Sequence, residues 1–265
     1  MRTMHLFAGA GGGLLADLIL GHTPVVAVEW EPYACQVLRE RAAEGWFPGL
    51  RVWEGDVRLF DPSEYAGSVD CIHAGFPCQD VSNAGAKAGV GEGTRSGLYR
   101  EALRAVRVVR PKFFYMENVS ALLSNGLGVV LGDMASMGYS VRWCCIQASD
   151  VGAPHERERW FALAYADGVR ELQPQGSQQD ERGRSGNGAK ETSDIMRTGL
   201  EGYRDEQIGN EPEHASSGGS CWWATESGVV RMVHGVPARV HRIKALGNAQ
   251  VPLQAAAAWR LLGGE

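Results

Sequence analysis

The sequence lacks the marks of a membrane-spanning or secreted protein. No run approaches the roughly eighteen consecutive apolar residues of a transmembrane helix. Residues 1–5 lead directly into a glycine-rich segment, without the apolar stretch of a signal peptide. The six cysteines include no Cys-x-x-Cys pair, which argues against a disulfide framework and against structural zinc. We therefore expect a cytoplasmic protein with no membrane association and no metal.

The sequence also lacks the basic excess that nucleic-acid-binding proteins usually carry, since its formal net charge is -5. The charge is uneven along the chain. Residues 1–165 hold 15 basic and 18 acidic residues, residues 166–228 hold 6 and 12, and residues 229–264 hold 5 and none. Because the acidity is concentrated in the middle segment, the net charge does not exclude DNA as a partner.

Short β-rich runs alternate with helical patterns in the first part of the chain. This alternation predicts an α/β fold with a parallel sheet and crossover helices. One helix begins at Pro32 and is capped by Gly45, and a second spans 97–110 before Pro111. The expected strands are 4–7, 25–29, 51–53, 69–73, 113–117, 140–146 and 160–165.

The chain divides into three parts by composition. A first domain spans 1–166, an insertion spans 167–228, and a last segment spans 229–265. Between 170 and 221 only six side chains are large and apolar, too few to build a core. We expect an extended or disordered insertion, which a partner could order. The last segment contains a predicted helix at 252–259 and is expected to pack back onto the first domain.

A glycine-rich loop, Phe7-Ala8-Gly9-Ala10-Gly11-Gly12-Gly13, follows the first expected strand. Glycines let the backbone turn tightly and approach a ligand closely, although a purely structural turn would look similar. Glu29 ends the second strand, where a carboxylate can bind ribose hydroxyls, and Asp56 follows the third, where it could reach an adenine amino group. Each acid alone would also suit a strand end or a helix cap. Together they predict an adenosine-type ligand, either a dinucleotide or S-adenosylmethionine.

Two further motifs follow the fourth and fifth strands. Gly75-Phe76-Pro77-Cys78-Gln79 comes first, and Glu117-Asn118-Val119 second, so both are expected at the carboxyl edge of the sheet. A lone cysteine is usually a small buried hydrophobic residue. Cys78, however, directly follows a proline at a strand exit, and the segment 82–97 holds five glycines, which favours a loop that closes as a lid.

At this point the ordered set of motifs resembles the cytosine-C5 DNA methyltransferases of bacteria and phages. The resemblance covers about 1–165 and 229–262 and keeps the family's motif order. Its motifs are Phe7-Ala8-Gly9-Ala10-Gly11-Gly12, Glu29-Trp30, Asp56, Gly75-Phe76-Pro77-Cys78-Gln79, Glu117-Asn118-Val119, His155-Glu156-Arg157-Glu158-Arg159 and Gly247-Asn248-Ala249-Gln250-Val251-Pro252.

The resemblance implies a Rossmann-like S-adenosylmethionine-dependent methyltransferase fold with a small, poorly structured target-recognition region. It assigns catalysis to Cys78, Glu117, Arg157 and Arg159: Cys78 attacks cytosine C6, Glu117 binds N3 and the exocyclic amino group, and the arginines bind O2 and a phosphate. The cytosine is flipped out of double-stranded DNA. The implied cofactor site comprises Phe7, Gly9, Gly11, Gly12, Glu29, Trp30, Asp56, Val57, Pro77, Leu98 and Asn248.

The sequence departs from the family pattern in two places. His155 stands where a glutamine is common, and the region before the last motif is acidic and glycine-rich where relatives carry their target-recognition domain. DNA could instead be read by the basic helix 97–110 or by the basic stretch 231–244.

Three hypotheses remain: a DNA cytosine methyltransferase, acting as a monomer in or outside a restriction-modification system; a tRNA cytosine methyltransferase; and a non-catalytic DNA-binding relic. The less similar C-terminal half disfavours the second hypothesis, and the intact catalytic motifs disfavour the third.

Overall fold

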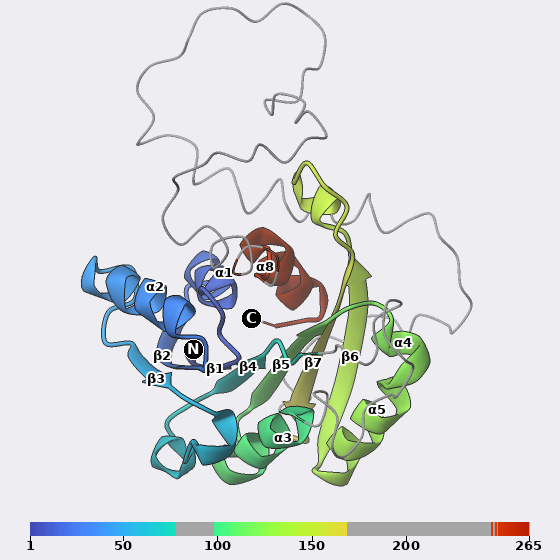
Figure 1. The fold of residues 1–265 in the computed structure, drawn as a ribbon. Helices are drawn as coiled ribbons and strands as arrows, with labels where there is room; N and C mark the ends of the chain where they lie inside the picture. The colour runs from blue at the N-terminus through green and yellow to red at the C-terminus, as the bar shows by residue number, and fades with distance from the viewer. Residues whose placement is uncertain (78–97, 169–244, 246, 248, 265) are drawn as a thin grey trace, which may run out of the picture.

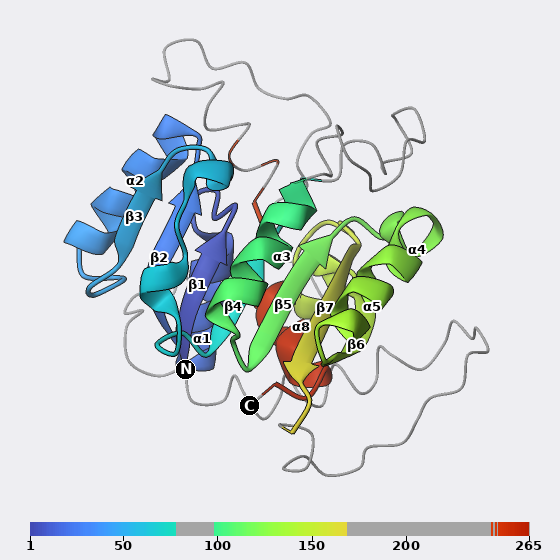
Figure 2. The same ribbon diagram turned by 90° about the horizontal axis from the view of Figure 1, so that it is seen from below.

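The computed structural model describes residues 1–77, 98–168, 245, 247 and 249–264. A twisted seven-stranded sheet runs through the middle of the molecule, with helices on both of its faces (Figure 1; Figure 2). The strands are β1 (Arg2–Leu6), β2 (Thr23–Glu29), β3 (Arg51–Glu54), β4 (Cys71–Ala74), β5 (Phe113–Asn118), β6 (Tyr139–Ile146) and β7 (Arg159–Ala166). The helices are α1 (Gly12–Leu20), α2 (Pro32–Ala43), α3 (Leu98–Val109), α4 (Leu122–Asn125), α5 (Leu127–Ser136) and α8 (Pro252–Leu261).

All seven expected strands are confirmed, with ends that differ by at most two residues. The sheet order is β3-β2-β1-β4-β5-β7-β6. The expectation of an entirely parallel sheet is wrong for β7, which pairs antiparallel with both β5 and β6. The physical reason is the connection between β6 and β7, which holds only a short 3-10 turn, η4 (Ala148–Val151). A parallel return usually runs through a crossover helix, and the segment between β6 and β7 contains none.

Each face of the sheet has its own apolar core. Helices α3 and α5 bury residues such as Leu103 and Met134 on one face. Helices α1 and α8 cover the other face, where Trp259 packs edge-on against the Tyr115 ring with centroids 5.2 Å apart. The Tyr115 hydroxyl also donates a 2.7 Å hydrogen bond to the Ala255 carbonyl. Helix α8, distant in sequence, is therefore an integral layer of the fold (Figure 1).

The predicted insertion, 167–228, lies outside the described residues except for its first two positions, so the three-part division of the chain stays a prediction. Within the described residues, no helix combines the length and the apolar character that crossing a bilayer requires.

The basic helix α3 is engaged within the domain. The Arg104 guanidinium donates to the carbonyls of Val57 and Phe60, at 2.8 and 3.0 Å. Arg110 follows the helix and precedes β5, so it lies at the sheet edge opposite to Glu117 and donates to the Met137 carbonyl at 3.0 Å. These contacts occupy two of the four arginines of the predicted basic helix, and a role of this helix in reading DNA stays a prediction.

A buried polar network lies beneath the glycine loop. Asp17 of α1 accepts hydrogen bonds from Thr3, from His5 Nε2 at 2.7 Å and from His22 Nδ1 at 3.3 Å. Burial alone would raise the pKa of Asp17, but His5 and His22 together lower it well below its ordinary value. The potential ligand atoms of His5, Asp17 and His73 lie within 4.8 Å of one another. A metal ion there would have to displace these hydrogen bonds.

We expect the Trp259→Ala substitution to lower the free energy of unfolding by about 3–5 kcal/mol, because it leaves a large cavity between α8 and the sheet. Urea denaturation measures this loss. The matched control is Trp46→Ala, at a side chain that is 51% exposed, which should cost about 1 kcal/mol at most. An equal effect of the two substitutions would contradict the role of α8 in the core.

Stability should also depend on pH through His73. Burial, reinforced by His5, lowers the pKa of His73 from 6.5 to about 3. Between pH 6.5 and 3, His73 is therefore protonated in the unfolded chain but not in the folded protein. Stability that is present above pH 6.5 is lost as the pH falls towards 3. Between pH 7 and pH 5, wild type should lose about 2 kcal/mol more than a His73→Gln variant. Urea midpoints at the two pH values measure the difference, and exposed His155→Gln should behave as wild type.

Candidate functional site

Glu29, at the end of β2, organises the glycine loop that follows β1. Its carboxylate is 7% exposed and accepts hydrogen bonds from the backbone N–H groups of Gly9 at 2.7 Å and of Trp30 and Glu31, both at 2.9 Å. A carboxylate has about four acceptor positions. One position, on Oε2 beside Gly9, is therefore left for a ligand hydroxyl.

The other predicted adenosine contacts lie along the same edge of the sheet. Asp56 is exposed and caps the 3-10 turn η1 (Val57–Leu59) by accepting from the Arg58 backbone N–H at 3.0 Å. Trp30 is 72% exposed, whereas Val57 is buried. The structure thus places an acid and an exposed aromatic ring next to the loop that Glu29 holds.

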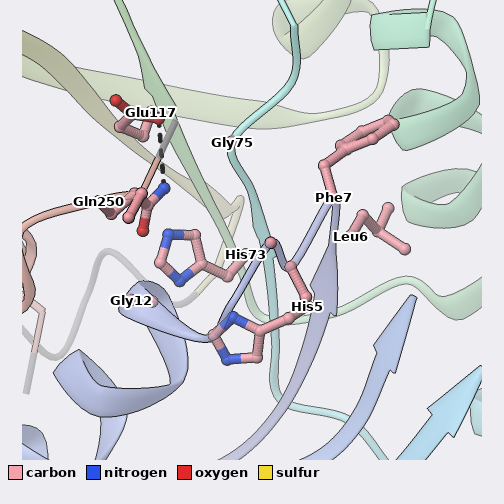
Figure 3. A pocket seen from close by; sticks show the side chains of 12 residues that line it. His5, Leu6, Phe7, Gly12, His73, Gly75, Glu117 and Gln250 are labelled. Atoms are coloured by element: carbon pink, nitrogen blue, oxygen red, sulfur yellow. Dashed lines mark hydrogen bonds between the residues drawn. The ribbon is translucent and has the colours of Figure 1, made fainter. Parts of the chain in front are cut away.

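A pocket opens between the glycine loop, the end of β4 and the C-terminal segment (Figure 3). It is lined by His5, Leu6, Phe7, Ala8, Gly9, Gly12, Gly13, His73, Gly75, Glu117, Ala249 and Gln250. A Cβ atom on Gly12 would collide with the Gln250 backbone. Phe7 has φ +58°, a left-handed conformation that is uncommon for a residue other than glycine and is often found at functional sites. Leu98, at the start of α3, and Phe7 are half-buried and pack against the same core.

Glu117 and Arg159 form an ion pair at the carboxyl end of β5. Arg159 Nε lies 3.1 Å from Glu117 Oε1, and the two side chains are only 20% and 14% exposed. Burial raises the pKa of Glu117, and the charge of Arg159 acts in the opposite direction. The structure therefore brings together these two predicted catalytic residues and gives the carboxyl group an increased affinity for a proton.

Arg157 points to a different set of partners. Its guanidinium donates to the carbonyl oxygens of Gly247 at 3.0 Å and Ala249 at 2.6 Å. Burial, followed by the charge of Arg159, lowers its pKa. Its φ of +32° is, like that of Phe7, a left-handed value at a residue other than glycine. In this structure Arg157 holds the C-terminal segment, and its predicted contact with the substrate stays a prediction.

The proline-cysteine and glutamate-asparagine motifs are joined by a side chain. Asn118 Nδ2 donates to the Phe76 carbonyl at 3.2 Å, and its Oδ1 accepts from the Val119 backbone N–H at 2.9 Å. Pro77 directly follows the carbonyl group that accepts this hydrogen bond from β5. Cys78, the predicted nucleophile, and Asn248, a predicted cofactor contact, lie outside the described residues.

Sequence reasoning gave no role to Gln250 and His73, although both line the pocket. Gln250 was visible inside the last motif, Gly247-Asn248-Ala249-Gln250-Val251-Pro252, but nothing in the pattern showed what its side chain contacts. His73 lies in the fourth expected strand and belongs to none of the motifs. Both become site residues only through the folding of distant segments.

The chain is similar in sequence and in structure to proteins of one known family. The family model described as C-5 cytosine-specific DNA methylase matches residues 1–233. The Type II methyltransferase M.CviJI of Paramecium bursaria Chlorella virus IL3A is 37% identical over 166 residues, which is 62% of this chain and 42% of that protein. The Type II methyltransferase M.NgoBI of Neisseria gonorrhoeae is 34% identical over 172 residues, 63% of this chain and 51% of that protein.

Among solved structures, a protein described as a DNA modification methyltransferase encoded within an Escherichia coli prophage superposes with a TM-score of 0.52 at 27% identity. The match covers 64% of this chain and 48% of that one. The chain thus spans about half the length of the curated relatives it matches. The predicted fold class, a Rossmann-like methyltransferase sheet, is confirmed by the strand order and by this likeness. Because the family model matches most of the sequence, the chain belongs to the C-5 cytosine-specific DNA methylase family.

Proposed function

We propose that this chain is a DNA (cytosine-5-)-methyltransferase, which transfers a methyl group from S-adenosylmethionine to C5 of a cytosine in double-stranded DNA. The observation that carries the proposal is the half-buried ion pair of Glu117 and Arg159. It stands at the sheet edge where the glycine loop meets the strand that leads to Cys78. A carboxyl group and a guanidinium group at this edge can bind and activate a cytosine ring beside a nucleoside cofactor.

The residues at the glycine loop fit an adenosine-containing cofactor. The loop backbone is fixed by Glu29, one of whose oxygens keeps an acceptor position for a ribose hydroxyl. The exposed Trp30 ring offers a flat apolar surface beside it, and Asp56 offers a carboxylate for the adenine amino group. When bound, S-adenosylmethionine supplies an electrophilic methyl group on a sulfonium. Phe7, Gly9, Gly11, Gly12, Val57, Pro77, Leu98 and Asn248 complete the proposed site.

Cys78 supplies the nucleophile. Cytosine C5 reacts poorly with an electrophile, so the ring must first be activated by addition at C6. The Cys78 thiolate forms the S–C6 bond, the C5–C6 π electrons form a C4–C5 double bond, and the N3–C4 π electrons move to N3, so C5 becomes an enamine carbon. A thiol has a pKa of about 8.5, so we assign to Arg159 and Arg157 the positive charge that favours the Cys78 thiolate. After methylation, loss of the C5 proton to a base or water expels Cys78.

Glu117 and Arg159 hold the ring during this addition. Negative charge develops on N3 as the thiolate adds, and a protonated Glu117 can donate to it while its other oxygen accepts from the exocyclic amino group. Burial raises the pKa of Glu117, which increases the population of this protonated form. Arg159 supplies a donor for the cytosine O2.

The target base leaves the DNA helix in this proposal. Attack at C6 and methyl delivery at C5 use opposite faces of the ring, and a stacked base exposes neither face. Rotation of the cytosine into the pocket costs a few kcal/mol of lost stacking and pairing.

The experiment that tests the function is bisulfite sequencing of DNA from cells that express the chain. We expect methylated cytosines within a short sequence motif. Unmodified DNA, together with a folded protein that binds the cofactor, would refute the proposal. Transfer of label from the cofactor to tRNA but not to DNA would select the RNA-methylating alternative, and no transfer to either would select the DNA-binding relic.

We expect wild type to form a covalent adduct with DNA that carries 5-fluorocytosine at the target, because fluorine at C5 blocks the final elimination. The Cys78→Ala protein should form none, and denaturing gel electrophoresis distinguishes the two. The adduct in the Cys78→Ala protein would rule out the nucleophile assignment.

We expect Glu117→Gln to lower kcat by about a hundredfold to ten-thousandfold, because the amide cannot deliver a proton to N3. Single-turnover methylation assays measure the rate. An unchanged rate would show that proton donation comes from elsewhere.

A further inference from the structure

The Gln250 side chain lies at the centre of the pocket, between Glu117 and His73 (Figure 3). Its Nε2 donates to Glu117 Oε2 at 3.3 Å, across 133 residues of sequence. Its Oε1 is buried without a hydrogen-bond partner. The proposed catalytic scheme makes no use of this side chain, although it contacts the carboxyl group on which the scheme depends.

Two glycines, one at the start of α1 and one after β4, leave room for the Gln250 side chain. A Cβ atom on Gly75 would lie 2.9 Å from Gln250 Nε2 and 3.1 Å from Glu117 Oε2. A Cβ atom on Gly13 would lie 2.9 Å from Gln250 Oε1. Real Cβ atoms do not approach polar atoms so closely. The space for the amide is therefore formed jointly by the first turn of α1 and the loop after β4.

The backbone that carries Gln250 is fixed independently of its side chain. Arg157 binds the carbonyl oxygens of Gly247 and Ala249, at 3.0 and 2.6 Å. Four residues after Gln250, the Gln254 amide donates to the Arg157 carbonyl at 2.9 Å and to the Ile146 carbonyl at 2.7 Å. The amide of Gln250 thus approaches Glu117 from an anchored segment.

The charges around Glu117 determine the direction of this contact. Two charged groups act on the Glu117 carboxyl: Arg157, and Arg159, which contacts Oε1. The titratable neighbour on the same strand is the buried Tyr115. Burial raises the pKa of Glu117, while the charge of Arg159 and then the hydrogen bond from the Gln250 amide lower it. The reversed amide would place Gln250 Oε1 against a carboxylate oxygen, which is repulsive. The amide therefore presents its N–H group to Glu117.

We propose that Gln250 is a positioning residue for Glu117: the carboxyl group is held between two donors, Arg159 on Oε1 and Gln250 on Oε2. The role of this orientation in binding cytosine rests on the proposed function, but the contact itself does not. Gln250 thereby links the C-terminal segment to the group that is proposed to bind the target base.

The test measures the titration of Glu117 directly. The protein is labelled with [δ-13C]glutamate, and the Glu117 signal is assigned by its absence in Glu117→Gln. The Gln250→Met variant keeps the side-chain length but lacks the donor, so the ionised carboxylate loses a stabilising contact. We expect the pKa of Glu117 to rise by about one unit. The matched control is Gln36→Met, which removes an exposed 2.9 Å contact from Gln36 Nε2 to Glu40 Oε1 on α2 and should leave Glu117 unchanged.

An unchanged Glu117 titration in a folded Gln250→Met protein would overturn the proposal. Should that variant fail to fold, Gln250→Glu keeps the shape and replaces the donor with a second carboxyl group. The coupled pair should then take up its first proton at a higher pH than Glu117 does in wild type, and titration at the wild-type pH would equally overturn it.

Kinetics separate this proposal from the proposed function. In Gln250→Met we expect the single-turnover methylation rate at saturating S-adenosylmethionine to fall by about tenfold, because the loss of the held orientation outweighs the larger fraction of protonated Glu117. An unchanged rate together with an unchanged titration refutes the positioning role. A wild-type protein that methylates nothing, while its Glu117 still responds to Gln250→Met, refutes the proposed function and leaves the positioning role intact.

Discussion

The arrangement of the site depends on the hydrogen bonds that the Arg157 guanidinium donates to two backbone carbonyls. Arg157 follows the β6–β7 turn, and its partners, Gly247 and Ala249, lie 90 and 92 residues further along the chain. A guanidinium presents its N–H groups in a fixed planar fork, so it can hold both carbonyls at once, whereas a lysine would act as a single point. This contact determines where the chain enters α8 and where Gln250 meets Glu117. Charge-assisted hydrogen bonds compensate for the partial burial of the arginine.

Much of the fold could be predicted because local signals and tertiary packing agree. The β-rich runs 25–29 and 113–117 are buried on both faces as strands β2 and β5, and Pro32 begins α2 as expected. The direction of β7 could not be predicted from such runs. Strand direction depends on how the connecting segment returns, and the segment between Ile146 and Arg159 gave no clear helical or turn pattern.

The site was predictable where a residue type and its strand end carry the chemistry. Glu117, Arg159 and Glu29 do lie at one edge of the sheet. The interactions of Glu29 with backbone N–H groups, and of Arg157 with carbonyls, were not predictable because they depend on the path of the main chain. Gln250 shows the same limit: its contact with Glu117 exists only once segments 133 residues apart have met.

This large separation has a consequence for the order in which the protein is assembled. The sheet joins segments that are near in sequence, but the Tyr115 contact with Ala255 spans 140 residues and the Glu117 contact with Gln250 spans 133. Long-range contacts form late, because the entropy of closing a long loop must be overcome first. During synthesis, the sheet face that Trp259 covers stays exposed until α8 emerges. The nascent chain can therefore bury one core early, but it acquires its complete site only at the last step of folding.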